Sequence, residues 1–184
     1  MLPEKVVALS KTKLILLMVA AIGFVAVGIW LLTLDAQVIA SQPRFNSPTF
    51  IYAIAVVAIL FFGACGYIGV KKFFDDTPGL ILNAEGIFDN SSGVSAGLVP
   101  WSDIAGINEY TIGRQKFISI LVYDPEKYAE RGNALRRMTN KANIKMCGTP
   151  INISANSLQV SYPELLAMVN DYFQYYQQGD ARKG

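Results

Sequence analysis

The side chains that usually carry catalysis or metal binding are few in this chain and do not cluster in the sequence. Its 184 residues include no histidine, the commonest general base and the commonest neutral metal ligand. Asp75 and Asp76 offer two adjacent carboxylates, but no further oxygen ligand for a divalent cation follows nearby, so we expect a solvated linker and no metal site. Cys147 has no histidine to activate it, although Lys145 would modestly lower the pKa of the thiol. Nucleophilic catalysis is therefore not expected.

A glycine- and serine-rich segment, residues 91–97, resembles a phosphate-binding loop only superficially. It lacks the GxxxxGK[ST] spacing and lies between predicted strands rather than before a helix, so a flexible strand connection is expected. Trp101 could stack on a base or a sugar, but in a predicted strand it is expected to fill the core. These patterns predict a protein that is not an enzyme and needs no cofactor.

The segment after residue 123 combines basic and apolar side chains at helical spacing. Asp124 and Pro125 are typical of a helix start, and the helix is predicted to run into the low 140s. On a continuous helix, five basic side chains share about a third of the circumference: Lys127, Arg131, Arg137, Lys141 and Lys145. An apolar stripe runs beside them: Tyr128, Leu135, Met138, Ala142 and Met146. Residues 126–145 carry a net charge of +4.

Two interpretations of this segment remain open. The five basic residues are candidates for contact with an anionic membrane surface or a protein partner, with the apolar stripe entering the same interface. Alternatively, the stripe packs on the sheet, Glu126 and Glu130 partly neutralise Arg137, and Gly132 weakens a long helix.

Two uncharged stretches, residues 14–34 and 50–70, predict transmembrane helices. Each forms a helix about 31 Å long, close to the thickness of the hydrocarbon core. The first is too long for a signal peptide and lacks a cleavage site. The composition agrees, because 52% of the residues are hydrophobic and only 16% are charged. The chain is therefore expected to be an integral membrane protein.

The positions of glycine and of basic residues predict how these spans are arranged. Gly63, Gly66 and Gly69 place small side chains on one drifting face, expected to pack against the first span rather than to mediate dimerisation. Basic residues lie mainly outside the hairpin: Lys5, Lys11 and Lys13 before it, Lys71 and Lys72 after it, and Arg44 in the connector. The positive-inside rule then predicts that both termini are cytoplasmic.

After the second span the pattern changes to short strand-like runs separated by turn residues. Residues 71–184 contain twelve basic and twelve acidic residues, so a nucleic-acid partner is not expected. A last amphipathic helix, opened by Ser161 and Glu164, is predicted to close the sheet. The predicted organisation, in chain order, is N-terminus 1–13, span 14–34, connector 35–49, span 50–70, linker 71–77, domain 78–178 and disordered tail 179–184.

Two motifs in this domain resemble a known family. The runs LILNAEGI, residues 80–87, and VPWSDI, residues 99–104, look like the strand, turn, strand and W-x-D-I pattern of bacterial pleckstrin-homology-like (PH-like) domains. The layout is similar to that of small two-span inner-membrane proteins of bacteria. The resemblance implies an α+β fold, in which a transmembrane hairpin precedes an antiparallel sheet or partial barrel capped by a C-terminal helix. It implies no activity, and the first hairpin has no match to the basic phosphoinositide-binding loop of eukaryotic relatives.

We therefore expect a membrane-anchored binding or scaffolding module at the cytoplasmic face of the bacterial inner membrane, recognising a protein partner or the lipid surface. The alternative is an immunity or resistance protein that neutralises a membrane-targeted toxin through its spans or its outer connector. A membrane-tethered hydrolase is disfavoured by the absence of histidine and of a nucleophile elbow.

Overall fold

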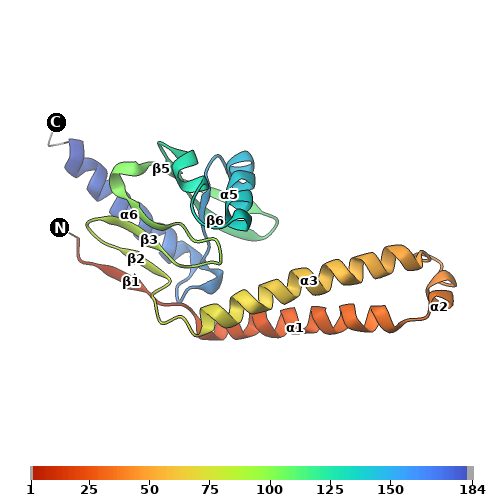
Figure 1. Cartoon of the computed structure of the whole chain (residues 1–184). Helices are drawn as coiled ribbons and strands as arrows, with labels where there is room; N and C mark the ends of the chain where they lie inside the picture. The colour runs from red at the N-terminus through yellow and green to blue at the C-terminus, as the bar shows by residue number, and fades with distance from the viewer. Residues whose placement is uncertain (1, 182–184) are drawn as a thin grey trace. The chain divides into compact units, whose positions relative to one another are not determined.

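The computed structural model describes residues 2–181 and divides into two compact units (Figure 1). Residues 11–75 form one unit, called here the hairpin unit. The other described residues, 2–10 and 76–181, form the second unit, called here the sheet unit. The chain thus leaves the sheet unit, builds a helical hairpin and returns to the same folded unit.

The hairpin unit contains two long antiparallel helices, α1 (Lys11–Thr33) and α3 (Pro48–Phe73). Both are long and apolar enough to cross a membrane, and only 17% and 6% of their most apolar windows are buried. A core helix of a soluble protein would be mostly buried, so these helices indicate association with a membrane. The rings of Phe24 and Phe62 stack between them, with centroids 4.2 Å apart.

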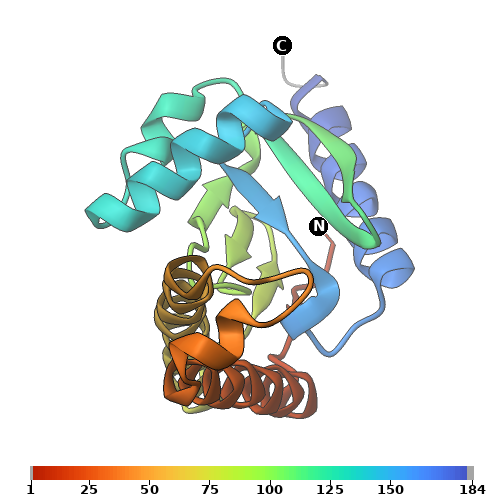
Figure 2. The same cartoon turned by 90° about the vertical axis from the view of Figure 1, so that its right-hand side faces the viewer.

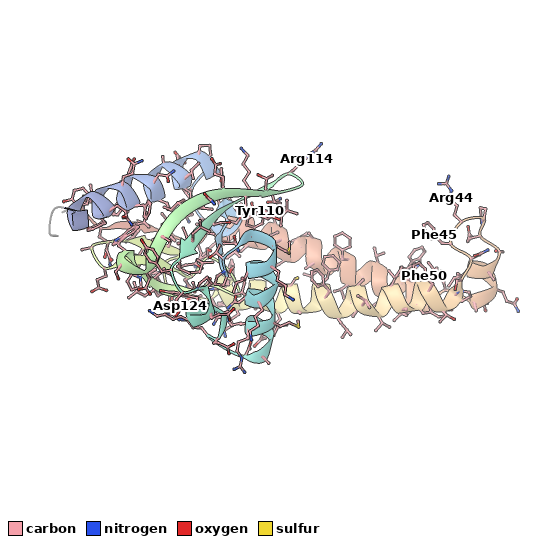
Figure 3. The ribbon with its side chains drawn as sticks, turned by 90° about the horizontal axis from the view of Figure 1, so that it is seen from above. Arg44, Phe45, Phe50, Tyr110, Arg114 and Asp124 are labelled. Carbon is pink, nitrogen blue, oxygen red and sulfur yellow. The ribbon has the colours of Figure 1, made fainter. Side chains whose placement is uncertain are left out.

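The predicted connector between the spans contains a short helix, α2 (Ala36–Ala40). Asp35 caps it by accepting a hydrogen bond of 2.7 Å from the backbone N–H of Gln37. The hydroxyl of Tyr52 on α3 donates a bond of 2.7 Å to the carbonyl of Leu34. Arg44 and Phe45 follow in the loop before α3 (Figure 3).

The first sheet has four antiparallel strands in the order β1 (Lys5–Val7), β2 (Leu80–Leu82), β3 (Gly86–Asp89) and β4 (Gly97–Pro100). The β2–β3 hairpin agrees with the predicted strands around Asn83 to Gly86. Strand β1 was not predicted, and it pairs with β2 through Lys5 and Leu82. The N-terminal segment before the first span is therefore part of the folded domain rather than a separate tail.

The second sheet has three antiparallel strands in the order β5 (Ile104–Ile112), β6 (Gln115–Val122) and β7 (Ile151–Ile153). Trp101 was predicted to lie within a strand, but it begins the 3₁₀ turn η1 (Trp101–Asp103), which separates the two sheets. Within residues 2–181 the strands form two open sheets and no closed barrel.

The C-terminal helix α6 (Tyr162–Ala181) covers the sheets as predicted. Ser161 and Glu164 form the expected capping box, with bonds of 3.0 Å and 2.7 Å to the Glu164 carboxylate. Its apolar face is buried at Leu165, Val169 and Tyr172. The helix continues to Ala181, so residues 182–184 of the predicted disordered tail alone lie outside the described residues.

Two further helices, α4 (Pro125–Ala129) and α5 (Ala134–Cys147), connect β6 to β7. Figures 1 and 2 show α5 and α6 on different sides of the sheets. Between α5 and α6, the turn η2 (Ala155–Ser157) follows β7. The α4–α5 segment carries all five predicted basic contact residues.

Candidate functional site

The single helix predicted from Pro125 into the low 140s is in fact two helices. Helix α4 ends at Ala129, and Gly132 has a φ of +87°, which a residue with a side chain rarely adopts. Asn133 then caps α5 by accepting a bond of 3.0 Å from the N–H of Arg136. The break ends the helical phase between Lys127 and the later basic residues, so the five do not share one helical face.

Helix α4 is fastened to the turn η1 through Asp103. The Lys127 ammonium and the Tyr128 hydroxyl donate hydrogen bonds of 2.6 Å and 2.5 Å to Asp103 Oδ2. Asp124 also caps the helix, accepting a bond of 3.1 Å from the backbone N–H of Lys127. The bond from Lys127, followed by that from Tyr128, lowers the pKa of Asp103. Burial, followed by the bond to Asp103, raises the pKa of Tyr128.

Two arginines hold the loop before β4 in place. Arg131 Nη1 donates bonds of 3.2 Å to the carbonyls of both Ala96 and Leu98, and its guanidinium lies 4.0 Å from the centre of the Tyr128 ring. Arg136 donates a short bond to the carbonyl of Ser95. Arg131, like Lys127, thus contacts groups of the sheet unit itself.

The same loop, residues 91–97, was predicted to be a flexible connection, but internal hydrogen bonds organise it. Buried Asp89 accepts bonds of 2.9 Å and 2.6 Å from the N–H and hydroxyl of Ser91 and one of 3.0 Å from the N–H of Ala96. A buried carboxylate that accepts three bonds fixes the path of the chain around it. The loop therefore gives Arg131 and Arg136 a defined set of carbonyl acceptors.

Helix α5 is oriented by Asn140, which is only 6% exposed and donates a bond of 3.2 Å to the carbonyl of Tyr128. The opposite face of the helix is apolar and exposed. Leu135, Met138 and Met146 are 61%, 66% and 55% exposed. Packing of this stripe on the sheet, one of the two predicted arrangements, is therefore excluded for these three residues, whereas Tyr128 of the same stripe is buried.

Three of the predicted basic residues border this apolar surface. Arg137, Lys141 and Lys145 are exposed and follow one another at intervals of four residues, so they form a row along α5. Glu130 pairs with Lys141, with 2.8 Å between Oε1 and Nζ. Its hydrogen bond raises the pKa of Lys141, and the reciprocal bond lowers the pKa of Glu130. We call the exposed residues Leu135, Arg137, Met138, Lys141, Ala142, Lys145 and Met146 the α5 face.

The α5 face contains an open depression of about 640 Å³. It is lined by Glu130, Ala134, Arg137, Met138, Lys141, Ala142 and Lys145. The short side chains of Ala134 and Ala142 lie between longer ones, which leaves this space. The arrangement offers a row of donors beside an apolar strip, suited to binding an anionic amphiphile or an acidic apolar surface.

No protein-family model, curated protein or solved structure matches this chain. Residues 80–87 adopt the predicted strand, turn and strand. Trp101 and Asp103 of W-x-D-I lie in the turn η1 and have distinct structural roles. Trp101 stacks on Tyr176, with centroids 5.3 Å apart, and donates a bond of 2.8 Å to the carbonyl of Asn83. Asp103 holds α4.

The carboxylates and the thiol considered for metal binding and catalysis lie in different surroundings. Across residues 2–181, no three His, Cys, Asp or Glu side chains are grouped in a way that could hold a metal ion. Asp75 forms an ion pair of 3.4 Å with Lys72. Burial raises the pKa of Cys147, opposite to the lowering expected from Lys145.

The glycines predicted to mediate helix packing differ in what they face. A Cβ atom on Gly69 would lie 2.8 Å from Met18 Cγ, and one on Gly66 would lie 3.8 Å from Ala21 Cβ. Nothing lies within 4 Å of the corresponding position at Gly63. Among the described glycines of the hairpin unit, Gly28 of α1 lies nearest to the opposite helix, because a Cβ there would lie 2.7 Å from Ile59 Cγ1. Sequence reasoning missed Gly28 because glycine is common in membrane helices.

Proposed function

We propose that this protein is a membrane-anchored, non-enzymatic binding module whose binding surface is the α5 face. The observation that supports this proposal is the exposure of Leu135, Met138 and Met146 on α5. The opposite face of this helix is held against the sheet unit by the hydrogen bond from Asn140 to the Tyr128 carbonyl. Contiguous apolar side chains on a soluble surface often mark an interaction site. Asp103 and Tyr128, two of the groups whose pKa values are shifted, hold α4 in place, which argues for a structural role of these two residues over a catalytic one.

We further propose that the domain is PH-like and lies on the cytoplasmic side of a bacterial inner membrane. Strand β1 precedes α1 and pairs with β2, which follows α3, so the chain enters and leaves the hairpin unit on one side of a bilayer. Lys11, Lys13, Lys71 and Lys72 lie at these ends, as the positive-inside rule requires. Reporter fusions at Arg44 and after Gly184 should report opposite compartments, and equal reports would contradict the proposed topology.

Site-specific photocrosslinking in native membranes tests the binding role. A photoreactive phenylalanine analogue replaces Met138 in the full chain, and the matched control replaces Gln174, an exposed residue of α6. Irradiation should give a lipid or protein adduct at position 138 and a markedly weaker one at position 174. Equal adducts at both positions, or none at position 138, would contradict a binding role for the α5 face.

A further inference from the structure

We propose that the α5 face binds the anionic phospholipid headgroups of the membrane that holds the chain's own hairpin. This inference rests on the binding role proposed above and assigns its ligand. The ligand class is a phosphate-bearing headgroup at a lipid surface, with Arg137, Lys141 and Lys145 as its cationic contacts and Met138 as the central apolar contact. An acidic, apolar protein segment is the competing ligand.

The first support is that the basic residues of the α4–α5 segment fall into two groups, those that bind the fold and those that are exposed on α5. Arg131 donates hydrogen bonds to carbonyls of β4 and of the loop before it, Arg136 donates to a carbonyl of that loop, and Lys127 is paired with Asp103. Arg137 and Lys145 instead extend from the exposed side of α5. The cations not used to hold the fold are thus gathered at one border of the apolar strip, the arrangement expected of a helix lying in a membrane interface.

The second support is the charge that remains on this surface. Glu130 is the acidic residue lining the depression, and its carboxylate pairs with Lys141. The pairing raises the pKa of Lys141, so its ammonium stays charged at neutral pH. Arg137, Lys141 and Lys145 together with Glu130 leave a net charge of +2 facing outward. An anionic leaflet attracts such a surface, and salt weakens the attraction.

The third support is the shape and flexibility of the face. Helix α5 has 14 residues and is therefore about 21 Å long, enough to span several headgroups. Methionine and lysine side chains adapt to an irregular or fluid surface. The depression beside Ala134 and Ala142 is open and bordered by Arg137, Lys141 and Lys145. A phosphate group there would be reached by cations from successive turns of one helix.

Chain connectivity favours a lipid surface over a separate protein. Three residues, 8–10, separate β1 from α1, and six residues, 74–79, separate α3 from β2. Three extended residues span only about 10 Å, so the sheet unit is held close to the headgroups of the bilayer that α1 enters. Tethering of this kind raises the effective concentration of the surface and allows a weak contact to be occupied.

Spin labelling of the full chain in nanodiscs tests the assignment. With Cys65→Ala and Cys147→Ser as background, a nitroxide is attached at Met138→Cys or, as the control, at Gln174→Cys. Nanodiscs contain phosphatidylcholine alone or a mixture with phosphatidylglycerol. In the anionic discs the label at position 138 should become shielded from a water-soluble nickel chelate and more accessible to oxygen, and added salt should reverse the change. The label at position 174 should respond to neither.

Two variants with the same change in net charge test whether Arg137, Lys141 and Lys145 cause the shielding of the label at position 138. Arg137→Glu with Lys145→Glu should abolish the shielding that anionic lipid produces at position 138. Arg114→Glu with Lys116→Glu makes the same change in net charge on the β5–β6 hairpin, where Figure 3 places Arg114, and should leave the shielding intact. Equal shielding in neutral and anionic discs, or equal loss in both variants, would overturn the lipid assignment.

The outcomes separate this inference from the proposed function. A protein adduct at position 138 in native membranes, without shielding by anionic lipid, identifies a protein ligand, so the lipid assignment fails while the binding role stands. Absence of both an adduct and shielding refutes both. Shielding restricted to anionic discs and removed by the Arg137 and Lys145 reversals supports the lipid assignment.

Discussion

The hydroxyl of Tyr128 donates a hydrogen bond of 2.5 Å to the carboxylate of Asp103, which lies 25 residues earlier in the chain. Lys127 donates to the same oxygen, so two consecutive residues of α4 are fixed to the turn between the two sheets. Tyr128 in turn provides the ring beneath Arg131 and the carbonyl that accepts from Asn140. The orientation of α5 therefore depends on contacts that begin at Asp103.

Replacing Asp103 by Asn should destabilise the sheet unit by about 1 to 2 kcal/mol at neutral pH, because hydrogen bonds to a charged acceptor are stronger than those to a neutral one. Its side chain is 23% exposed and that of Lys127 is 48% exposed, so a larger value is not expected. Thermal unfolding of the full chain in detergent measures the change, with Trp101 as the fluorescent reporter in a Trp30→Phe background. The control Glu85→Gln, at an exposed carboxylate, should leave the midpoint unchanged.

The same variant should alter how stability depends on pH. The pKa of Asp103 is lower in the folded state, so its carboxylate contributes stability that is present above the unfolded pKa and lost as the pH falls through the folded pKa. The difference between the original chain and Asp103→Asn should be constant above about pH 5 and shrink on further acidification. A difference that stays constant into strong acid would show that the charge of Asp103 is not responsible.

Leu9→Ala tests whether the segment before α1 belongs to the core. Leu9 is buried, forms an isolated bridge with Leu158 and lies against Gly79. Truncating its side chain should therefore lower the free energy of unfolding of the sheet unit by about 2 to 4 kcal/mol. Val6→Ala, at an exposed position of β1 in the same N-terminal segment, is the matched control and should lower the free energy of unfolding much less. An unchanged Trp101 unfolding midpoint for Leu9→Ala would show that the segment before α1 does not belong to the core. A fragment beginning at Thr77 lacks β1 and Leu9, so its sheet unit should unfold at a lower temperature than that of the full chain.

The two long apolar helices, the hairpin at residues 80–89 and the last helix were predictable because each depends on local sequence. Residues 50–70 are apolar throughout, and Ser161 with Glu164 specifies a helix start. Strand β1 was not predictable in this way. It has only three residues, Lys5–Val7, and its partner β2 lies beyond the entire hairpin unit. Pairing over such a separation leaves no periodic signal in a single sequence.

The candidate site was predicted in part. The row of Arg137, Lys141 and Lys145 follows from helical spacing alone, but the orientation of that helix does not. Asn140 reads as a poor helix former in the sequence, yet its amide fixes the inward face of α5. Arg131 and Arg137 are chemically identical in the sequence, and only the position of the Ala96 and Leu98 carbonyls separates a structural arginine from a surface one.

Two glycine-to-leucine substitutions in the hairpin unit should disturb the packing of α1 against α3 to different extents. Gly28→Leu should separate α1 from α3, because any Cβ at residue 28 lies 2.7 Å from Ile59 Cγ1 and 3.2 Å from the Ala55 carbonyl oxygen. Gly63→Leu should be tolerated, since the space beside Gly63 is open. Disulfide trapping between cysteines introduced at Phe24 and Phe62, in a Cys65→Ala and Cys147→Ser background, measures the separation. Equal trapping in both leucine variants would contradict the observed helix interface.

Arg131 and Arg137 should differ in what each contributes to the stability of the sheet unit. Arg131→Ala removes two hydrogen bonds to edge carbonyls and the cation–π contact with Tyr128, so it should destabilise the sheet unit by about 1 to 3 kcal/mol. Arg131→Lys should restore little of this, because an ammonium cannot reproduce the planar guanidinium fork that reaches both carbonyls and lies over the ring. Arg137→Ala, which removes an exposed guanidinium, should leave stability within about 0.5 kcal/mol. Hydrogen exchange should also accelerate at Ala96 and its neighbours only in the Arg131 variants. Equal destabilisation by both alanine variants would show that the two arginines are not divided between a structural role and a surface role.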